Sequence, residues 1–239
     1  MSIKNNIEQV LSRINTTKAQ CGARQRVQLI AVSKTQPLNK IVDAHNNGIT
    51  QIGENKIQEA VEKFTKKDEP RGLKKRFIGH LQSNKINKCL QLFDTVDSID
   101  SLRLIKKLNK KAGDVGKTIP ALLEINTTDE TQKHGFNPED IDAILASLGF
   151  ENISVCGLMT LGPRNKKTTA TRRAFKRLRD LKDEINRQSD GTPITELSMG
   201  MTGDLEIGIQ EGSTMVRIGT GIFGERQAAP YKLKTINQL

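Results

Sequence analysis

Aromatic side chains are scarce in this chain of 239 residues, which holds seven Phe, one Tyr and no Trp. Few rings are therefore available to stack on bases, and the sequence has no recognised nucleic-acid-binding motif. Lys and Arg total 38 against 27 Asp and Glu, which leaves a net charge of +11 that could attract phosphates. Much of this charge lies in stretches already mixed with acids and leucines, such as 171–187. A solvated basic surface is the preferred interpretation, and no nucleic-acid partner is expected.

Cysteine is also rare, and long hydrophobic runs are absent. Cys21, Cys89 and Cys156 are widely spaced and odd in number, so they predict neither a disulfide framework nor a C-x-x-C metal pair. No run approaches the ~18 apolar residues of a membrane helix, and residues 1–17 lack the apolar block of a secretory signal. We therefore expect a cytoplasmic protein in a reducing compartment, with no metal site and no membrane partner.

Eight short β-branched or apolar runs alternate with longer amphipathic ones along the chain. The runs cover 27–33, 51–55, 76–81, 93–98, 120–126, 154–160, 194–200 and 214–220. Several are apolar at consecutive positions, which is typical of strands covered on both faces. The helical candidates between them cover 38–48, 56–67, 101–113, 137–149, 166–188 and 203–212. This alternation predicts parallel strands joined by helical crossovers.

Eight such units of about 30 residues predict an α/β fold, a single (β/α)8 TIM barrel. A doubly wound open sheet is the structural alternative, but its G-x-G-x-x-G fingerprint is missing after the first run. Segment 2–20 predicts a further helix that packs on the barrel. Pro230 interrupts the last residues, which make a poor helix. We expect residues 1–239 to form one domain.

The active site of such a barrel lies at the carboxyl ends of its strands, and phosphate often binds in the loops after strands seven and eight. The first of these loops, MTGD (201–204), offers Thr202 as an N-cap-like hydroxyl at a helix start, where N–H groups and the helix dipole stabilise an anion. In the second, GTG (219–221), the glycines allow close backbone approach and Thr220 adds a hydroxyl. We predict a phosphate cradle, with two ordinary glycine-rich turns as the alternative.

Lys34 emerges from the end of the first apolar run. A free lysine, with a pKa near 10.4, is only about one part in 2,500 neutral at pH 7. Partial burial beside a cationic neighbour would lower that pKa and favour a Schiff base, whereas a surface lysine would have no such role. A lysine that faces a phosphate site across a barrel mouth offers the two attachments that pyridoxal phosphate needs.

Arg217 precedes the second loop and shares a strand face with Gly219, so it points into the barrel if Gly219 lines the mouth. A buried guanidinium needs an acceptor, either a cofactor ring nitrogen or a barrel carboxylate such as Glu124 or Glu54. Because arginine keeps its proton, it would leave that ring nitrogen unprotonated and the cofactor a weak carbanion sink. Such a site suits carriage or racemisation better than transamination.

These residues lie in longer blocks of sequence. The blocks are LIAVSKTQP (29–37), IGENKIQEA (52–60), FIGHLQSNK (77–85), VDSIDS (96–101), CGLMTL (156–161) and LSMGMTGDLEIGIQEGSTMVRIGTGIFGER (197–226). They resemble the pyridoxal phosphate homeostasis proteins, the YggS/PROSC family, over nearly the whole chain. The resemblance implies a PLP-binding barrel similar to the N-terminal domain of alanine racemase.

The resemblance also assigns roles to individual residues. Lys34 would carry pyridoxal 5′-phosphate as an internal aldimine, with Asn55 near the cofactor and Arg217 facing the ring nitrogen. The residues that would surround the phosphate are Ser198, Thr202, Gly219 and Thr220. Met159 and Met201 would be either neighbours of the cofactor or core residues.

Three positions bear on how far the resemblance extends. Lys75-Arg76 stands where the family often has Trp-His, and Gln36 stands where many members have a second lysine. Lys133 resembles a family lysine in a mobile loop, which makes it a candidate transient acceptor of the cofactor, with a solvated loop charge as the alternative.

A racemase is the main rival function, and it needs a second acid or base on the other face of the substrate. The single tyrosine, Tyr231, lies in the tail, and the chain ends before a second domain would fit. Cys89 and His80 could be proposed, but a buried structural Cys89 and a hydrogen-bonded structural His80 are the preferred interpretations. We therefore expect a monomeric carrier that hands the cofactor to apo-enzymes, with no catalytic residue of its own.

Overall fold

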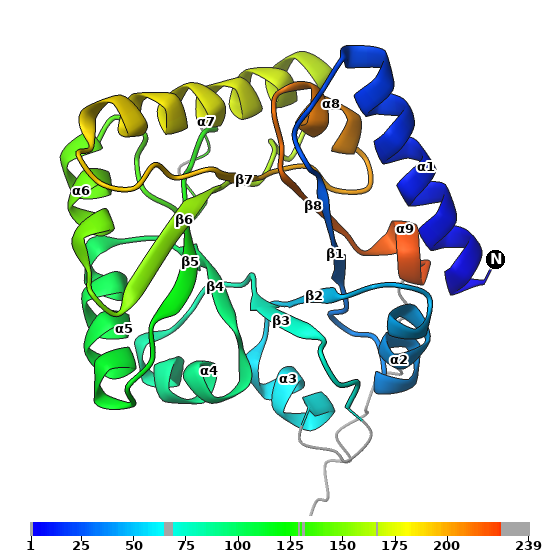
Figure 1. The fold of residues 1–239 in the computed structure, drawn as a ribbon, viewed down its shortest axis with the longest axis horizontal. Coiled ribbons are helices and arrows are strands. Elements are labelled where there is room, and N and C mark those ends of the chain that lie inside the picture. The colour runs from blue at the N-terminus through cyan, green and yellow to red at the C-terminus, as the bar shows by residue number, and fades with distance from the viewer. Residues whose placement is uncertain (1, 65–68, 129, 131, 166, 226–239) are drawn as a thin grey trace, which may run out of the picture.

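The computed structural model describes residues 2–64, 69–128, 130, 132–165 and 167–225, and in these residues eight parallel strands close into a barrel (Figure 1). Each strand pairs with the next, and β8 returns to pair with β1. The strands are β1 Gln28–Val32, β2 Gln51–Glu54, β3 Lys74–Phe77, β4 Thr95–Ile99, β5 Ile119–Glu124, β6 Ile153–Met159, β7 Glu196–Ser198 and β8 Met215–Ile218. The predicted (β/α)8 architecture is confirmed.

Helices follow the strands and form an outer ring around the barrel (Figure 1). They are α1 Ile3–Cys21, α2 Leu38–Asn46, α3 Ile57–Phe64, α4 Ile86–Leu92, α5 Leu102–Asp114, α6 Ile141–Ala146, α7 Thr168–Gln188, α8 Leu205–Gln210 and α9 Thr220–Phe223, with 3-10 turns at Ser83–Lys85 and Ser147–Gly149. No described helix is long and apolar enough to cross a membrane. The tail that contains Pro230 and Tyr231 lies outside the described residues.

The observed strands differ from the predicted runs by one or more residues at their ends, most clearly at β3, at β8 and at β7, where 194–200 was predicted and Glu196–Ser198 is observed. The run predicted at 76–81 is β3 Lys74–Phe77, because the chain leaves the ladder where Gly79 packs against the backbone of Asn55. A Cβ at Gly79 would lie 2.2 Å from the carbonyl oxygen of Asn55, so only glycine fits there. The run predicted at 214–220 ends at Ile218, and α9 begins at Thr220.

Apolar side chains fill two layers, one inside the barrel and one between the barrel and its helices. Ile30, Leu122, Met159 and Met215 form the inner cluster, which makes Met159 a core residue. The larger outer cluster includes Val216 and Ile218 of β8. Alternation along β8 therefore directs Val216 and Ile218 outward, as predicted. Burying each large apolar side chain contributes about 1.5–3 kcal/mol to folding.

A chain of polar groups, buried at Arg76 and Asp97 and partly buried at Gln28 and Gln51, links β1 to β4. Gln51 donates to Gln28 at 2.8 Å, and Arg76 donates to Gln51 at 2.9 Å. Arg76 also binds Asp97 through Nε and a terminal nitrogen, at 2.6 and 3.1 Å. Arg76 is therefore a buried ion-pair partner, and this interior arrangement satisfies its charge.

The N-terminal helix α1 covers the segments that precede and follow β8. Ser2 caps the helix by accepting from Asn5 N, and the chain leaves it at Gly22, whose φ is 65°. Asn6 donates to the carbonyl of Ile222 at 2.8 Å. Arg13 binds the Glu206 carboxylate, and it donates to the carbonyl of Thr202 at 3.0 Å. The helix thus fixes the two loops predicted to hold phosphate (Figure 1).

Candidate functional site

Lys34 lies in the turn directly after β1, at the carboxyl end of the barrel, and is partly buried. Lys34 lies two residues beyond Val32, the last residue of β1, whose Ile30 faces the inner core. The turn is closed by Gln36 N, which donates to Ser33 O at 3.0 Å. Thr35 adopts a left-handed φ of 65°, which is uncommon for a residue other than glycine.

A buried ion pair supports this turn from the helix layer. Lys63 of α3 donates to the carbonyl of Ser33 at 2.8 Å and to Glu54 Oε1 at 2.7 Å. Ser33 Oγ donates to the same Glu54 oxygen at 2.6 Å, and Lys63 also binds Glu59 at 2.6 Å. Burial raises the pKa of Glu54, against the opposing effect of Lys63. Only one local sequence signal indicates this network, the i,i+4 spacing of Glu59 and Lys63, so it was not predicted.

The loops after β7 and β8 meet at Thr202. Its hydroxyl oxygen accepts hydrogen bonds from Thr220 Oγ1 and from Gly221 N, both at 3.3 Å. The prediction that Thr202 acts as the N-cap of the following helix is wrong. Asp204 is the N-cap of α8, and its carboxylate accepts from Met201 N at 2.5 Å. Because Asp204 already closes that turn, Thr202 is left to join the two loops.

Strand pairing brings these loops beside Lys34. Ala31 of β1 pairs with Ile218 of β8, and a Cβ at Gly219 would lie 3.5 Å from the carbonyl oxygen of Val32. At Gly221 a Cβ would lie 2.8 Å from Ile218 Cγ2 and 3.1 Å from Thr202 Cγ2, so a side chain there would force the loops apart. The predicted lysine and the predicted cradle therefore end adjoining strands.

Arg217 is buried inside the barrel, as predicted from the alternation along β8. It donates to the carbonyl of Ser198 at 2.8 Å, to the Ser198 hydroxyl at 2.6 Å and to the carbonyl of Thr160 at 2.8 Å. Its hydrogen bonds therefore go to neutral oxygens of β7 and of the residue after β6. Glu54 instead belongs to the outer network with Lys63. The Ser198 hydroxyl accepts from Arg217 and keeps its own hydrogen as a donor.

Glu124 is the last residue of β5 and lies at the barrel mouth. Burial clearly affects the ionisation of its carboxyl group. Burial and the nearby charge of Asp100 raise the pKa of Glu124 to about 7, while Arg217, His80 and Lys133 oppose the shift. Glu124 is therefore an electrostatic neighbour of Arg217, although the hydrogen bonds of that guanidinium go to Ser198 and Thr160. A carboxyl group with this pKa exchanges its proton near neutral pH.

The remaining predicted residues occupy different environments. Asn55 follows β2, partly buried, and its backbone packs against Gly79. Met201 is 39% exposed, unlike the core residue Met159. Cys89 lies buried in α4, and burial raises the pKa of its thiol to about 12, which confirms the structural interpretation.

Two residues of the mouth have well-defined partners. His80 Nδ1 lies 2.8 Å from Asp100 Oδ2, which confirms a hydrogen-bonded histidine. Lys133 donates to the carbonyl of Gly162 at 2.8 Å, and its side chain is only 13% exposed. The alternative of a solvated loop charge is therefore wrong for Lys133, whereas its part in cofactor transfer stays a prediction.

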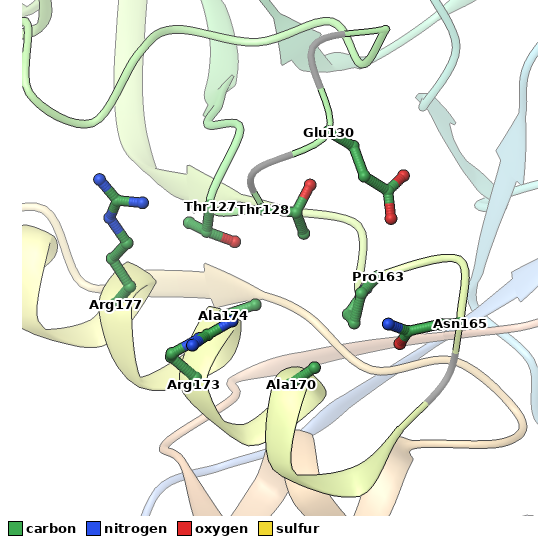
Figure 2. A pocket seen from close by; sticks show the side chains of 9 residues that line it. All are labelled: Thr127, Thr128, Glu130, Pro163, Asn165, Ala170, Arg173, Ala174 and Arg177. Carbon is green, nitrogen blue, oxygen red and sulfur yellow. The ribbon is translucent and has the colours of Figure 1, made fainter.

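A cavity that the sequence analysis did not predict lies between α7 and the loops after β5 and β6 (Figure 2). Its volume is about 490 Å³. Arg173 and Arg177 line it from α7, opposite Thr127 and Thr128. None of the predicted cofactor residues lines this cavity, so it is separate from the Lys34 and Thr202 cluster.

The fold and the site together define one class of protein, a (β/α)8 barrel with a lysine after β1 and joined threonine loops after β7 and β8. Consistent with this, the model of the alanine racemase N-terminal domain matches residues 5–227. The chain belongs to this family and, within it, to the pyridoxal phosphate homeostasis proteins.

Individual relatives show how close the match is. The pyridoxal phosphate homeostasis protein of Vibrio cholerae is 36% identical over 230 residues, which cover 94% of this chain and 97% of that protein. The structure of PipY from Synechococcus elongatus with PLP bound has a TM-score of 0.82 at 32% identity, covering 93% of this chain and all of PipY. Alanine racemase of Clostridium difficile shares the fold, with a TM-score of 0.70 at 16% identity over 92% of this chain and 56% of the racemase.

Proposed function

We propose that this protein binds pyridoxal 5′-phosphate at the barrel mouth, with Lys34 attached to the aldehyde carbon and the loops after β7 and β8 around the phosphate. The observation that carries the proposal is the pairing of β1 with β8. Because Ala31 pairs with Ile218, the Lys34 turn and the Thr220 loop end adjoining strands. The relatives named for PLP homeostasis and the PLP-bound structure of PipY support the same ligand.

The donors present fit such a group. Thr202 and Thr220 offer hydroxyls, and Gly219 and Gly221 let the loops approach each other and β1 closely. Arg217 supplies a fixed, protonated guanidinium inside the barrel for the pyridine ring. Asn55 and Ser198 complete the predicted set. When bound, the cofactor would supply an electrophilic carbonyl and an electron-withdrawing ring.

We propose that this site carries the cofactor and maintains its intracellular supply, and that the protein acts as a cytoplasmic monomer serving apo-enzymes. A racemase needs proton transfer on both faces of its substrate. Cys89 is buried in the helix layer, away from the mouth, and the His80 ring is bonded to Asp100. Burial removes Cys89 as a second base, and the relatives named for PLP homeostasis favour a carrier over an alanine-racemase-type enzyme.

The cofactor attachment is tested by borohydride reduction of the PLP-loaded protein, followed by tryptic peptide mass mapping. We expect a pyridoxyl group on the peptide that contains Lys34, and loss of the visible cofactor band in Lys34→Ala. Lys133→Ala serves as the matched control at the same mouth and should keep both signals. A reduced wild-type sample with no modification on Lys34 overturns the assignment.

A second experiment separates the carrier from the racemase. The PLP-loaded protein is incubated with D- and L-amino acids, and in parallel with an apo-enzyme that requires PLP. We expect activation of the apo-enzyme and no sustained racemisation. Turnover of any amino acid at about 1 s⁻¹ or faster contradicts the carrier proposal.

A further inference from the structure

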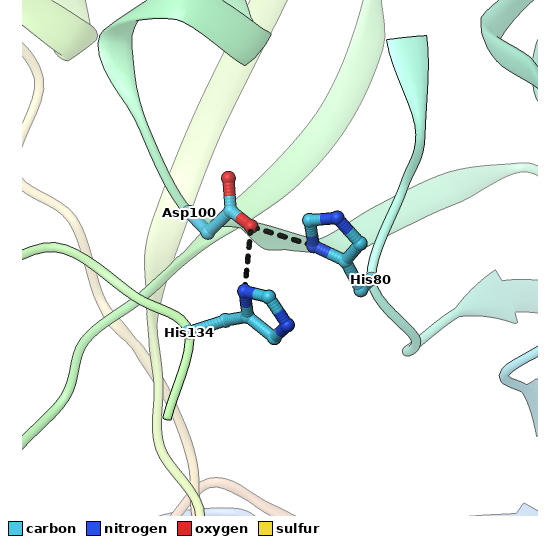
Figure 3. A group of neighbouring side chains, drawn as sticks. All are labelled: His80, Asp100 and His134. Atoms are coloured by element: carbon cyan, nitrogen blue, oxygen red, sulfur yellow. Dashed lines mark hydrogen bonds and ion pairs between the residues drawn. The ribbon is translucent and has the colours of Figure 1, made fainter. Parts of the chain in front are cut away.

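Two histidines and one aspartate meet at the mouth, from the segments that follow three consecutive strands (Figure 3). His80 follows β3, Asp100 follows β4, and His134 lies in the loop after β5. His80 Nδ1 and His134 Nδ1 approach the same carboxylate oxygen, Asp100 Oδ2, at 2.8 and 3.9 Å. The two rings stack with their centroids 4.1 Å apart, and the three donor atoms lie within 4.8 Å of one another.

This set of donors matches the needs of a divalent transition-metal ion. Zn²⁺ binds imidazole nitrogen at about 2.0–2.1 Å and carboxylate oxygen at about 2.0–2.2 Å, so tetrahedral ligand atoms lie about 3.3 Å apart. The observed separations of 2.8 and 3.9 Å lie on either side of that value. The histidine side chains are 45% and 60% exposed, so small rotations of the two rings could equalise the distances.

The neighbouring backbone holds these side chains in place. Ser101 Oγ donates to the other Asp100 oxygen at 3.1 Å, and Ser98 Oγ donates to the carbonyl of Gly79, beside His80, at 2.6 Å. The loop that carries His134 returns to β5, where Phe136 N donates to the carbonyl of Glu124 at 2.8 Å. The Ser101 hydrogen bond orients the Asp100 carboxylate, as contacts to metal ligands commonly do. The other two fix the backbone beside His80 and His134.

Asp100 supplies the negative charge of the cluster, while the cations Arg217 and Lys133 lie near enough to oppose the rise in the pKa of neighbouring Glu124. The Asp100 carboxylate is 10% exposed and lies near the carboxyl group of Glu124, which responds to its charge. Most of the proposed cofactor residues lie in or after β1, β7 and β8, whereas Asn55 follows β2 and its backbone packs against Gly79, beside His80. The cluster therefore borders the proposed cofactor site at Asn55.

We propose that His80, Asp100 and His134 bind one divalent transition-metal ion of the zinc class, through two imidazole nitrogens and one carboxylate oxygen. Three protein ligands leave a further coordination position open to water or to an anionic group that enters the mouth. The sequence predicted no metal site, because its cysteines form no metal-binding pair. The proposed site uses histidine and aspartate ligands instead.

The experiment is a calorimetric titration of chelator-treated, PLP-loaded protein with Zn²⁺, in a Cys21→Ser background because that thiol is exposed and could bind zinc. We expect one ion per chain, with affinity weakened at least about tenfold in His134→Ala and in Asp100→Asn. His45→Ala is the matched control, because His45 is the third histidine and its ring binds the Ile49 carbonyl instead.

The same titration with Co²⁺ gives a spectroscopic measure of the ligand set. We expect visible ligand-field bands without sulfur charge-transfer bands, lost in His134→Ala. The exposed His134 ring makes this variant the decisive one if His80→Ala does not fold. No Zn²⁺ binding tighter than about 100 µM, roughly −5.5 kcal/mol, or equal binding in wild type and His134→Ala, overturns the proposal.

Discussion

The ammonium of Lys63 lies 2.7 Å from the carboxylate of Glu54, and both side chains are buried between the barrel and α3. The same ammonium binds the carbonyl of Ser33, the residue before Lys34. An ion pair outside the barrel thus fixes the turn that carries the candidate cofactor lysine at the barrel mouth. The second Glu54 oxygen has no hydrogen-bond partner among the described residues, so Lys63 and Ser33 carry the stabilisation of this carboxylate.

Lys63→Met should reduce the free energy of unfolding by about 3–5 kcal/mol, because it leaves the Glu54 carboxyl buried without its cation. The loss should be larger at pH 8 than at pH 5. Without Lys63 the pKa of Glu54 rises further, so the folded state keeps a proton that the unfolded chain releases as the pH rises. Urea unfolding at both pH values measures the effect. Lys56→Met, an exposed neighbour in sequence, is the control, and a Lys63→Met variant as stable as that control would contradict the argument.

Gly221→Ala should weaken PLP binding on the order of tenfold. The new Cβ would meet Ile218 Cγ2 and Thr202 Cγ2 at 2.8 and 3.1 Å, and relieving that overlap costs about 1–3 kcal/mol. Equilibrium titration with PLP gives the affinity. Gly203→Ala lies in the facing loop with no atom within 4 Å of its Cβ, so it should bind PLP like wild type. If the two variants bind PLP with equal affinity, the contact between the two loops does not contribute to PLP binding.

Glu124→Gln should flatten the pH dependence of stability in the cofactor-free protein. The folded pKa of about 7 lies above the ordinary 4.5, so the folded state holds a proton that the unfolded chain loses first. Stability from this group is therefore lost as the pH rises from about 4.5 to 7, by up to about 3 kcal/mol.

Thermal or urea unfolding of Glu124→Gln at pH 5 and pH 8 checks this expectation. The variant should gain stability over wild type at pH 8 and not at pH 5. Glu8→Gln is the matched control, because Glu8 is an exposed glutamate on α1 and its loss should change neither value. A gain for Glu124→Gln that is the same at both pH values would show that packing, and not ionisation, causes it.

Cys89 should resist alkylation in the native protein. Its side chain is buried in α4, and a thiol pKa of about 12 leaves almost no reactive thiolate at pH 8. Exposed Cys21 should react quickly under the same conditions. Peptide mapping after iodoacetamide treatment distinguishes the two thiols, and denaturant should make Cys89 reactive. Rapid labelling of native Cys89 would show that its thiol is accessible and reactive, and Cys89 would again be a candidate acid or base.

Local patterns in the chain were sufficient for the fold and for much of the mouth. Strand–helix alternation predicted the barrel, because a parallel strand needs a crossover before it can meet the next. The two-residue period of β8 predicted that Arg217 points inward, and the position of Lys34 after an apolar run predicted its place at the mouth. These features depend on neighbours in sequence, so they could be recognised without the folded structure.

Contacts between distant segments required the structure. Nothing near Thr202 in sequence shows that its hydroxyl meets Gly221 rather than capping α8, and nothing near Arg217 identifies Ser198 and Thr160 as its acceptors. His80, Asp100 and His134 come from three separate loops, so no spacing relates them. The amino-acid order specifies which strand each side chain follows and which face it takes. Barrel closure determines which loop ends become neighbours, because partners far apart in the chain meet only after all eight strands have paired.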